Sequence, residues 1–171
     1  MAYEIGDWSE FAVAHVGASA ALLGLVFVGL TINLRDVVAS RLLVNRAAEA
    51  VILLGSVLAT STVVLIPGQA RGALSAELIA LAAGIFAAVY LLQRGANEAE
   101  VASSEGRQGA PRVSILTRRA FGLGSPVLIS LAGITLAATS GGGLYWWPVA
   151  VIAAYAGAVA NAWVLLIEIL R

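Results

Sequence analysis

Five long apolar segments limit what this chain can fold into. They cover residues 11–34, 47–66, 75–93, 120–139 and 147–167. A helix needs about 20 mostly apolar residues to cross a bilayer, whereas the strands of a membrane barrel show ~10-residue segments of alternating polarity. The sequence therefore predicts an all-α, polytopic membrane bundle of about five transmembrane helices, forming a single transmembrane domain over residues 1–171.

The composition excludes most soluble classes of protein. Hydrophobic residues make up 60% of the chain and charged residues 12%, whereas soluble domains have roughly 45–50% and 25%. Ten basic residues balance ten acidic ones, so the basic excess typical of a nucleic-acid-binding protein is missing. We therefore expect the lipid bilayer to surround the chain, with no nucleic-acid partner.

The distribution of arginines predicts the orientation in the membrane. All ten basic residues are arginines, and nine lie in the first connection, the third connection and the C-terminal end. By the positive-inside rule that side is cytoplasmic. The N-terminus is then outside, the C-terminus is cytoplasmic, and residues 94–119 form a cytoplasmic loop. Abundant alanine and glycine without lysine favour a GC-rich bacterial source, and hence a bacterial cytoplasmic (inner) membrane.

Aromatic residues support the same orientation. Tyr3, Trp8 and Phe11 fall at the outer end of the first span, and residues 145–147 (Tyr-Trp-Trp) fall at the outer end of the fifth. Tryptophan and tyrosine are enriched where a bilayer meets water. The pattern predicts an aromatic belt at the outer interface.

Small residues at spacings of three and four are the strongest pattern inside the spans. The candidate packing residues are Gly17, Ala21, Gly24, Gly84, Gly157 and Asn161. Small residues let helix backbones approach closely in lipid, and a buried amide bonds across helices. The first and fifth spans carry small residues on several faces. We therefore expect them at the centre of the bundle or against another subunit. Packing within a monomer and association as a homo-oligomer, or with other membrane subunits, both remain open.

Three ionisable side chains within the spans or at their ends, His15, Glu49 and Glu168, are candidates for function, because burying a charge in lipid is costly. Glu168 lies three residues before Arg171, which favours a pair at the helix end. His15 is either a satisfied interfacial histidine or a pH sensor. Glu49 either pairs with Arg46, three residues earlier, or serves as an ion or proton ligand at an inner vestibule.

Motifs for catalysis are missing from the sequence. The chain has no cysteine and one histidine, and it contains no metalloprotease or serine-protease motif of the kinds found in membranes. We expect no enzyme activity, no metal and no cofactor.

One stretch resembles known membrane proteins. Residues 15–55 read HVGASAALLGLVFVGLTINLRDVVASRLLVNRAAEAVILLG. This resembles the opening of a group of small bacterial multi-pass proteins of unassigned function, whose first helix has a Ser-Ala-Leu-Leu-Gly-Leu-type run and ends in Ile-Asn-Leu. The resemblance covers roughly residues 12–55 and implies no activity. The same helix is similar to the pore helix of Orai-type calcium channels. However, Ile32 and Asn33 stand where those channels have their acidic selectivity residue, and the predicted direction of the helix is reversed.

These observations predict a non-enzymatic membrane protein that self-associates or acts as an accessory or modulatory subunit of a membrane complex. The alternative is an oligomeric ion channel lined by the first helix, because rings of charged side chains can select ions. In the channel hypothesis, Glu10 and His15 form the outer ring. The inner ring consists of Thr31, Asn33 and Arg35.

Overall fold

The computed structural model describes residues 2–103 and 112–169, with side chains for 2–95 and 119–167. Two short 3₁₀ helices and six α-helices make up these ranges, which contain no strand: η1 (Ile5–Trp8), α1 (Ser9–Ile32), α2 (Leu34–Ala39), α3 (Arg41–Val64), α4 (Arg71–Ser103), α5 (Arg112–Ala138), η2 (Gly143–Tyr145) and α6 (Trp146–Ile169). Five of the helices are long and apolar enough to cross a membrane. The predicted all-α fold with five spans is confirmed.

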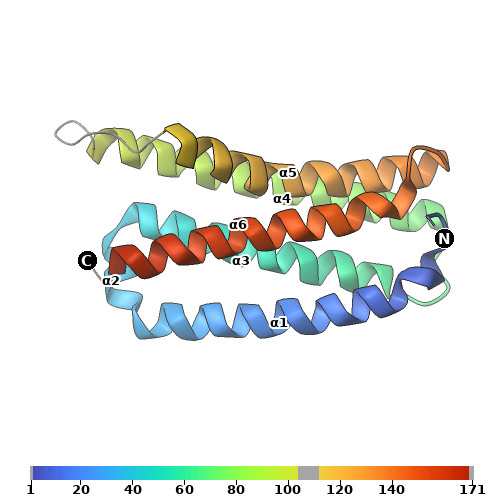
Figure 1. Ribbon diagram of the computed structural model, residues 1–171, viewed down its shortest axis with the longest axis horizontal. Coiled ribbons are helices and arrows are strands. Elements are labelled where there is room, and N and C mark those ends of the chain that lie inside the picture. Colours follow the sequence, from blue (N-terminus) through green and yellow to red (C-terminus); the bar gives the residue numbers. More distant parts are fainter. Residues whose placement is uncertain (1, 104–111, 170–171) are drawn as a thin grey trace.

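The five long helices lie side by side and alternate in direction (Figure 1). Helix α3 is central and packs against α1, α4 and α6, while α5 packs against α4 and α6. Helix α1 lies at the edge of the bundle and packs mainly along α3. The prediction of a central position therefore fits the fifth span, α6, but not the first.

The central position of α3 follows from its sequence. Its buried residues recur at spacings of three and four, which places them on one side of a helix. They include Leu53, Val57, Thr60 and Val64. Because this face carries both large apolar and small polar side chains, it fills the middle of the bundle and still offers hydrogen-bonding groups to its neighbours.

Two glycines allow helices to approach closely within the bundle. A Cβ atom at Gly157 of α6 would lie 2.8 Å from Leu53 Cδ1 of α3. A Cβ atom at Gly133 of α5 would lie 3.0 Å from the carbonyl oxygen of Ser75 on α4. The chain thus uses small residues for tight packing between its own helices, as expected in a membrane.

The expected loop 94–119 is helical at both of its ends. Helix α4 continues to Ser103, and α5 begins at Arg112; that residues 94–119 form the cytoplasmic connection between two spans stays a prediction. The stretch after Gly95 is rich in alanine and glutamate, which favour helix. These extensions lie beyond the parts of α4 and α5 that qualify as membrane spans.

The described arginines gather at one end of the bundle, where α1 and α4 end and α3 and α5 begin. Those with described side chains are Arg35, Arg41, Arg46, Arg94 and Arg119. Arg71 lies at the opposite end, at the start of α4. This separation is the one on which the predicted orientation depends; which end faces the cytoplasm stays a prediction.

Candidate functional site

The side of α1 that faces away from the bundle carries a row of small, exposed residues. Gly17, Ala21 and Gly24 are all exposed, and a Cβ atom at either glycine would meet nothing within 4 Å. Between positions 14 and 24 of α1, all exposed residues are alanine or glycine: Ala14, Gly17, Ala18, Ala20, Ala21 and Gly24. We call these six residues the small-residue face of α1. The buried residues of this helix, Ala12 and Ser19, lie on the other side.

The exposed surfaces of α5 and α6 differ from this face, because they are dominated by bulky apolar side chains. Those on α6 include Val149, Ile152, Val159 and Trp163, and those on α5 include Val127 and Ile134. On α4, Gly84 is exposed and lines a pocket with Ala80 and Ile85. Phe86 and Tyr90 are exposed on a different side of the same helix, where they stack with ring centroids 6.4 Å apart. The exposed residues of α1 between positions 14 and 24 are therefore all small, in contrast to the bulky exposed residues of α5 and α6.

The other predicted packing residues lie inside the bundle. Gly157 contacts Leu53, as described above, and Asn161, one turn further along α6, is 2% exposed. Both residues face the core, where they pack within one copy of the chain.

The six predicted ion-contact residues do not come together. Glu10 and Thr31 are exposed near the two ends of α1 and are about 31 Å apart along the helix. Thr31 Oγ1 donates to the carbonyl oxygen of Phe27, 2.8 Å away. Asn33 is half-buried and donates to the carbonyl oxygen of Gly29. Arg35 is exposed on α2.

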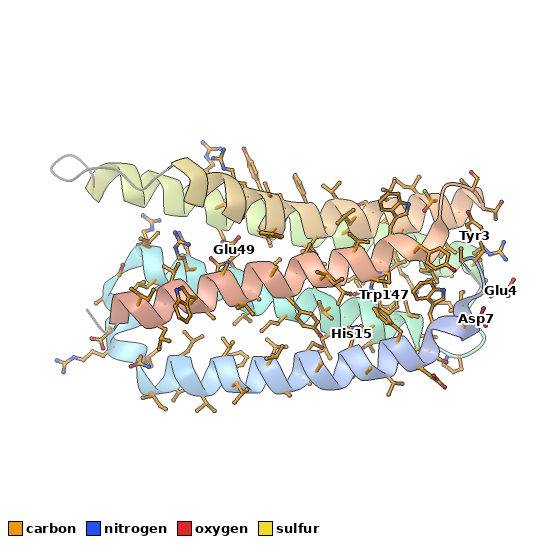
Figure 2. All side chains as sticks on the ribbon, in the orientation of Figure 1. Tyr3, Glu4, Asp7, His15, Glu49 and Trp147 are labelled. Atoms are coloured by element: carbon orange, nitrogen blue, oxygen red, sulfur yellow. The ribbon has the colours of Figure 1, made fainter. Side chains whose placement is uncertain are left out.

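His15 points from α1 into the bundle (Figure 2). Its Nδ1 atom lies 3.1 Å from the hydroxyl oxygen of Tyr155 on α6, a partner that the sequence pattern did not reveal. The His15 ring also packs against Phe11, with centroids 4.2 Å apart. Phe11 contacts Trp147 edge-on at 5.1 Å, and Trp147 contacts Trp8. This aromatic cluster joins the first half of α1 to α6.

Trp147 corrects the prediction of an aromatic belt. Its side chain is fully buried, and its Nε1–H donates to Thr60 Oγ1 of α3 at 3.2 Å. Its neighbour Tyr145 is 56% exposed. Trp8, Phe11 and Tyr145 do join Trp147 in one cluster, but part of this group is core rather than exposed surface.

Glu49 is completely buried in the bundle and binds a residue from another helix. Gln93 Nε2 of α4 donates to Glu49 Oε1 at 2.6 Å. Gly122 of α5 lies against this pair, since a Cβ atom there would come within 2.6 Å of Glu49 Oε1 and closer still to Gln93 Nε2. Three helices thus meet at one buried polar contact. Gln93 could not be predicted as the partner of Glu49, because the two residues are 44 positions apart and Gln93 marks only the end of an apolar segment.

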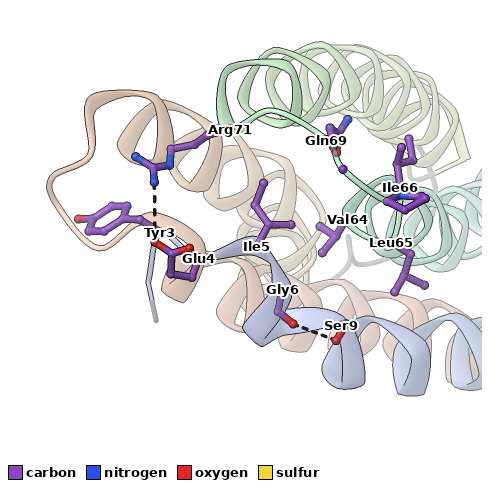
Figure 3. A pocket seen from close by; sticks show the side chains of 12 residues that line it. Tyr3, Glu4, Ile5, Gly6, Ser9, Val64, Leu65, Ile66, Gln69 and Arg71 are labelled. Carbon is purple, nitrogen blue, oxygen red and sulfur yellow. Dashed lines mark hydrogen bonds and ion pairs between the residues drawn. The ribbon is translucent and has the colours of Figure 1, made fainter.

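An open cavity of about 450 Å³ lies at the N-terminal end of the bundle (Figure 3). It is lined by the first residues of the chain and by the turn from α3 to α4. Arg71 lies 4.0 Å from Glu4 across its rim. The carbonyl oxygen of Ala2 accepts a hydrogen bond from the Leu144 amide, and Tyr3 Oη accepts one from the Gly142 amide. The N-terminal segment is therefore bound to the turn between α5 and α6 by these hydrogen bonds, and to the start of α4 by the Glu4–Arg71 ion pair.

Within the residues that the structure describes, no three histidine, cysteine or carboxylate side chains are placed to hold a metal ion. Compared with known proteins, the chain matches no family model, no curated sequence and no solved structure. A function for this chain is therefore inferred from the surfaces described above.

Proposed function

We propose that this protein is a non-enzymatic, multi-pass protein of a bacterial cytoplasmic membrane that acts through association within the bilayer, and that the small-residue face of α1 carries this association. The supporting observation is that six small residues lie together on the exposed side of a spanning helix. In this proposal the N-terminus is outside and the C-terminus is cytoplasmic.

The physics of packing in lipid supports this assignment. Apolar surface gains little by leaving lipid for protein, so helices associate where small residues allow close van der Waals contact. The chain follows this rule inside its own bundle, at Gly133 and Gly157. On α1 the same residue types remain uncovered.

The spacing along α1 favours a second copy of the same helix as the partner. Ala14, Gly17, Ala21 and Gly24 are separated by three, four and three residues, which is the seven-residue repeat of a left-handed helix pair. Two copies inserted in the same orientation present this repeat to each other in parallel. Self-association is therefore the primary proposal, and docking on a different membrane subunit uses the same face.

The test enlarges one residue of the face. Gly24→Leu introduces a side chain where the partner backbone must approach, so we expect a loss of about 1–3 kcal/mol, or a roughly 5- to 150-fold weaker association. Energy transfer between donor- and acceptor-labelled copies in liposomes measures it. Ala160→Leu, on the exposed side of α6, is the matched control and should leave association unchanged. Equal association of wild type and Gly24→Leu would contradict the proposal.

A second candidate function, an oligomeric ion channel, is favoured by the position of Glu10 and Thr31. Both residues continue the same seven-residue repeat, Glu10 about one turn before the small-residue face and Thr31 about two turns beyond it. If that face lined a symmetry axis, these side chains would form polar rings at the two ends of a narrow pore. In that case Gly24→Leu would lower single-channel conductance in planar bilayers while the oligomer stays intact.

A further inference from the structure

An apolar groove of about 250 Å³ opens between the second half of α1 and the end of α6. Its walls include Leu22, Val26 and Gly29 from α1 and Leu165 from α6. The polar residue in its lining is Asn33, which lies at the end of the groove next to α2. The groove lies on helices that qualify as membrane spans, so it faces the hydrocarbon region of the bilayer.

The groove lies beyond the aromatic and polar contacts of α1 with α6, next to Leu30, which packs against the buried cluster that includes Leu165 of α6. In the first half of α1, Phe11 packs on Trp147, and His15 bonds to Tyr155. Beyond these contacts a glycine faces the groove: a Cβ atom at Gly29 would meet nothing within 4 Å. The side chains of the bundle therefore leave this space unfilled.

The dimensions of the groove match one leaflet of a bilayer. From Leu22 to Asn33 the helix rises by eleven steps of about 1.5 Å, or roughly 16 Å. Half of a hydrocarbon core of about 30 Å is roughly 15 Å. An acyl chain that enters at the Asn33 end and lies along the groove would be covered by apolar side chains from the headgroup level to the bilayer midplane.

The charge at the open end favours an anionic headgroup. Arg35 is exposed on the short helix α2 and Arg41 is exposed at the start of α3, with Asp36 as the acidic residue between them in the sequence. Basic residues at the membrane surface attract anionic lipids. We propose that the groove binds one acyl chain of an anionic phospholipid whose headgroup lies at the level of α2. This inference is independent of the proposed self-association.

The experiment fills the groove and counts the bound lipid. Purified protein is titrated with dioleoylphosphatidylglycerol or dioleoylphosphatidylcholine, and binding is followed by native mass spectrometry. We expect one phosphatidylglycerol per chain, bound more tightly than phosphatidylcholine. Gly29→Leu places a side chain in the groove and should weaken phosphatidylglycerol binding at least tenfold. Ala162→Leu fills the groove from α6 and provides the same test if the first variant does not fold.

Three further variants separate the contribution of the headgroup charge from that of the acyl chain. Replacing Arg35 or Arg41 by glutamine should reduce the preference for phosphatidylglycerol roughly fivefold each. Gly24→Leu is the matched control on the same helix, because positions 24 and 29 are about 140° apart around α1. It should leave lipid binding unchanged, even where it weakens association between copies.

Three results would overturn the inference. Unchanged phosphatidylglycerol binding in both groove-filling variants would mean that lipid lies elsewhere. Equal affinity of wild type for the two lipids would remove the anionic headgroup. A change in oligomer size in Gly29→Leu, with lipid binding unaltered, would mean that a second protein chain covers the groove.

Discussion

The contact between Gly122, Gln93 and Glu49 gives the sharpest prediction about stability. Gly122→Ala adds a methyl group against Gln93 Nε2 and 2.6 Å from Glu49 Oε1. Overpacking of this kind costs about 1–3 kcal/mol. Weakening the buried hydrogen bond between Gln93 and Glu49 adds about 1–3 kcal/mol. Alanine is the better helix former by roughly 0.5–1 kcal/mol, so we expect a net loss of roughly 1–5 kcal/mol.

Gly124, two residues along the same helix, is the matched control. A Cβ atom there meets nothing within 4 Å, so Gly124→Ala retains the gain in helix propensity and should be neutral or stabilising by up to ~1 kcal/mol. Unfolding by sodium dodecyl sulfate in mixed lipid–detergent micelles, followed by circular dichroism, compares the two variants.

The double variant tests the cause of the loss. If the clash with Gln93 is responsible, Gln93→Ala should cost at least ~1 kcal/mol less in the Gly122→Ala background than in the wild type. The reasoning is refuted if Gly122→Ala and Gly124→Ala unfold at the same detergent concentration, because the tight approach of α5 to this pair would then carry no energetic weight.

Three more predictions follow from other parts of the fold. Trp147→Phe removes the donor to Thr60 and should lower the free energy of unfolding by about 1–2 kcal/mol, measured in the same detergent titration; no change would mean that the buried indole N–H finds an equal partner elsewhere. Gly143→Ala should cost about 1–3 kcal/mol, because φ is +53° and the new Cβ would lie 2.5 Å from a backbone oxygen of the N-terminal segment; a variant as thermally stable as wild type would contradict this. For topology, a single cysteine at Ala39 should be shielded from an impermeant external reagent and one at Ser140 should react, which is clean because the chain has no native cysteine; the reverse labelling would invert the orientation.

The five spans could be predicted from the sequence because hydropathy is a local property. Each segment carries its own signal, and the membrane requires a helix wherever that signal is long enough. The position of each span in the bundle is not local. Small residues on α1 and α6 look alike in sequence, yet Gly157 is enclosed by α3 and α5 while Gly17 is exposed. Which small face finds a partner inside the same chain depends on contacts among all five helices.

The candidate polar residues illustrate the same limit. Glu49 stands out in the sequence, because a carboxylate is rare within an apolar segment. Its partner Gln93 and the glycine that gives the pair room come from two other helices. Likewise, Trp147 reads as a membrane-interface residue, but its rotation about the axis of α6 directs it at Thr60. The sequence predicts where along each span these side chains fall. Their partners depend on helix rotation, which depends on packing.

The uneven attachment of α1 links the two proposals. Its first half is held to α6 by the aromatic cluster and by the bond between His15 and Tyr155. In its second half, Leu30 packs against a cluster that includes Leu43 of α3 and Leu165 of α6, and the groove lies beside this contact. Stability within a protein is lowest where few buried contacts exist, so the second half of α1 is the part of the bundle whose position depends most on its surroundings. A lipid chain in the groove would support it from one side, and a second copy on the small-residue face would support it from another. Since Gly29 and Gly24 lie on different sides of the helix, the two ligands do not compete, and each can be removed without the other.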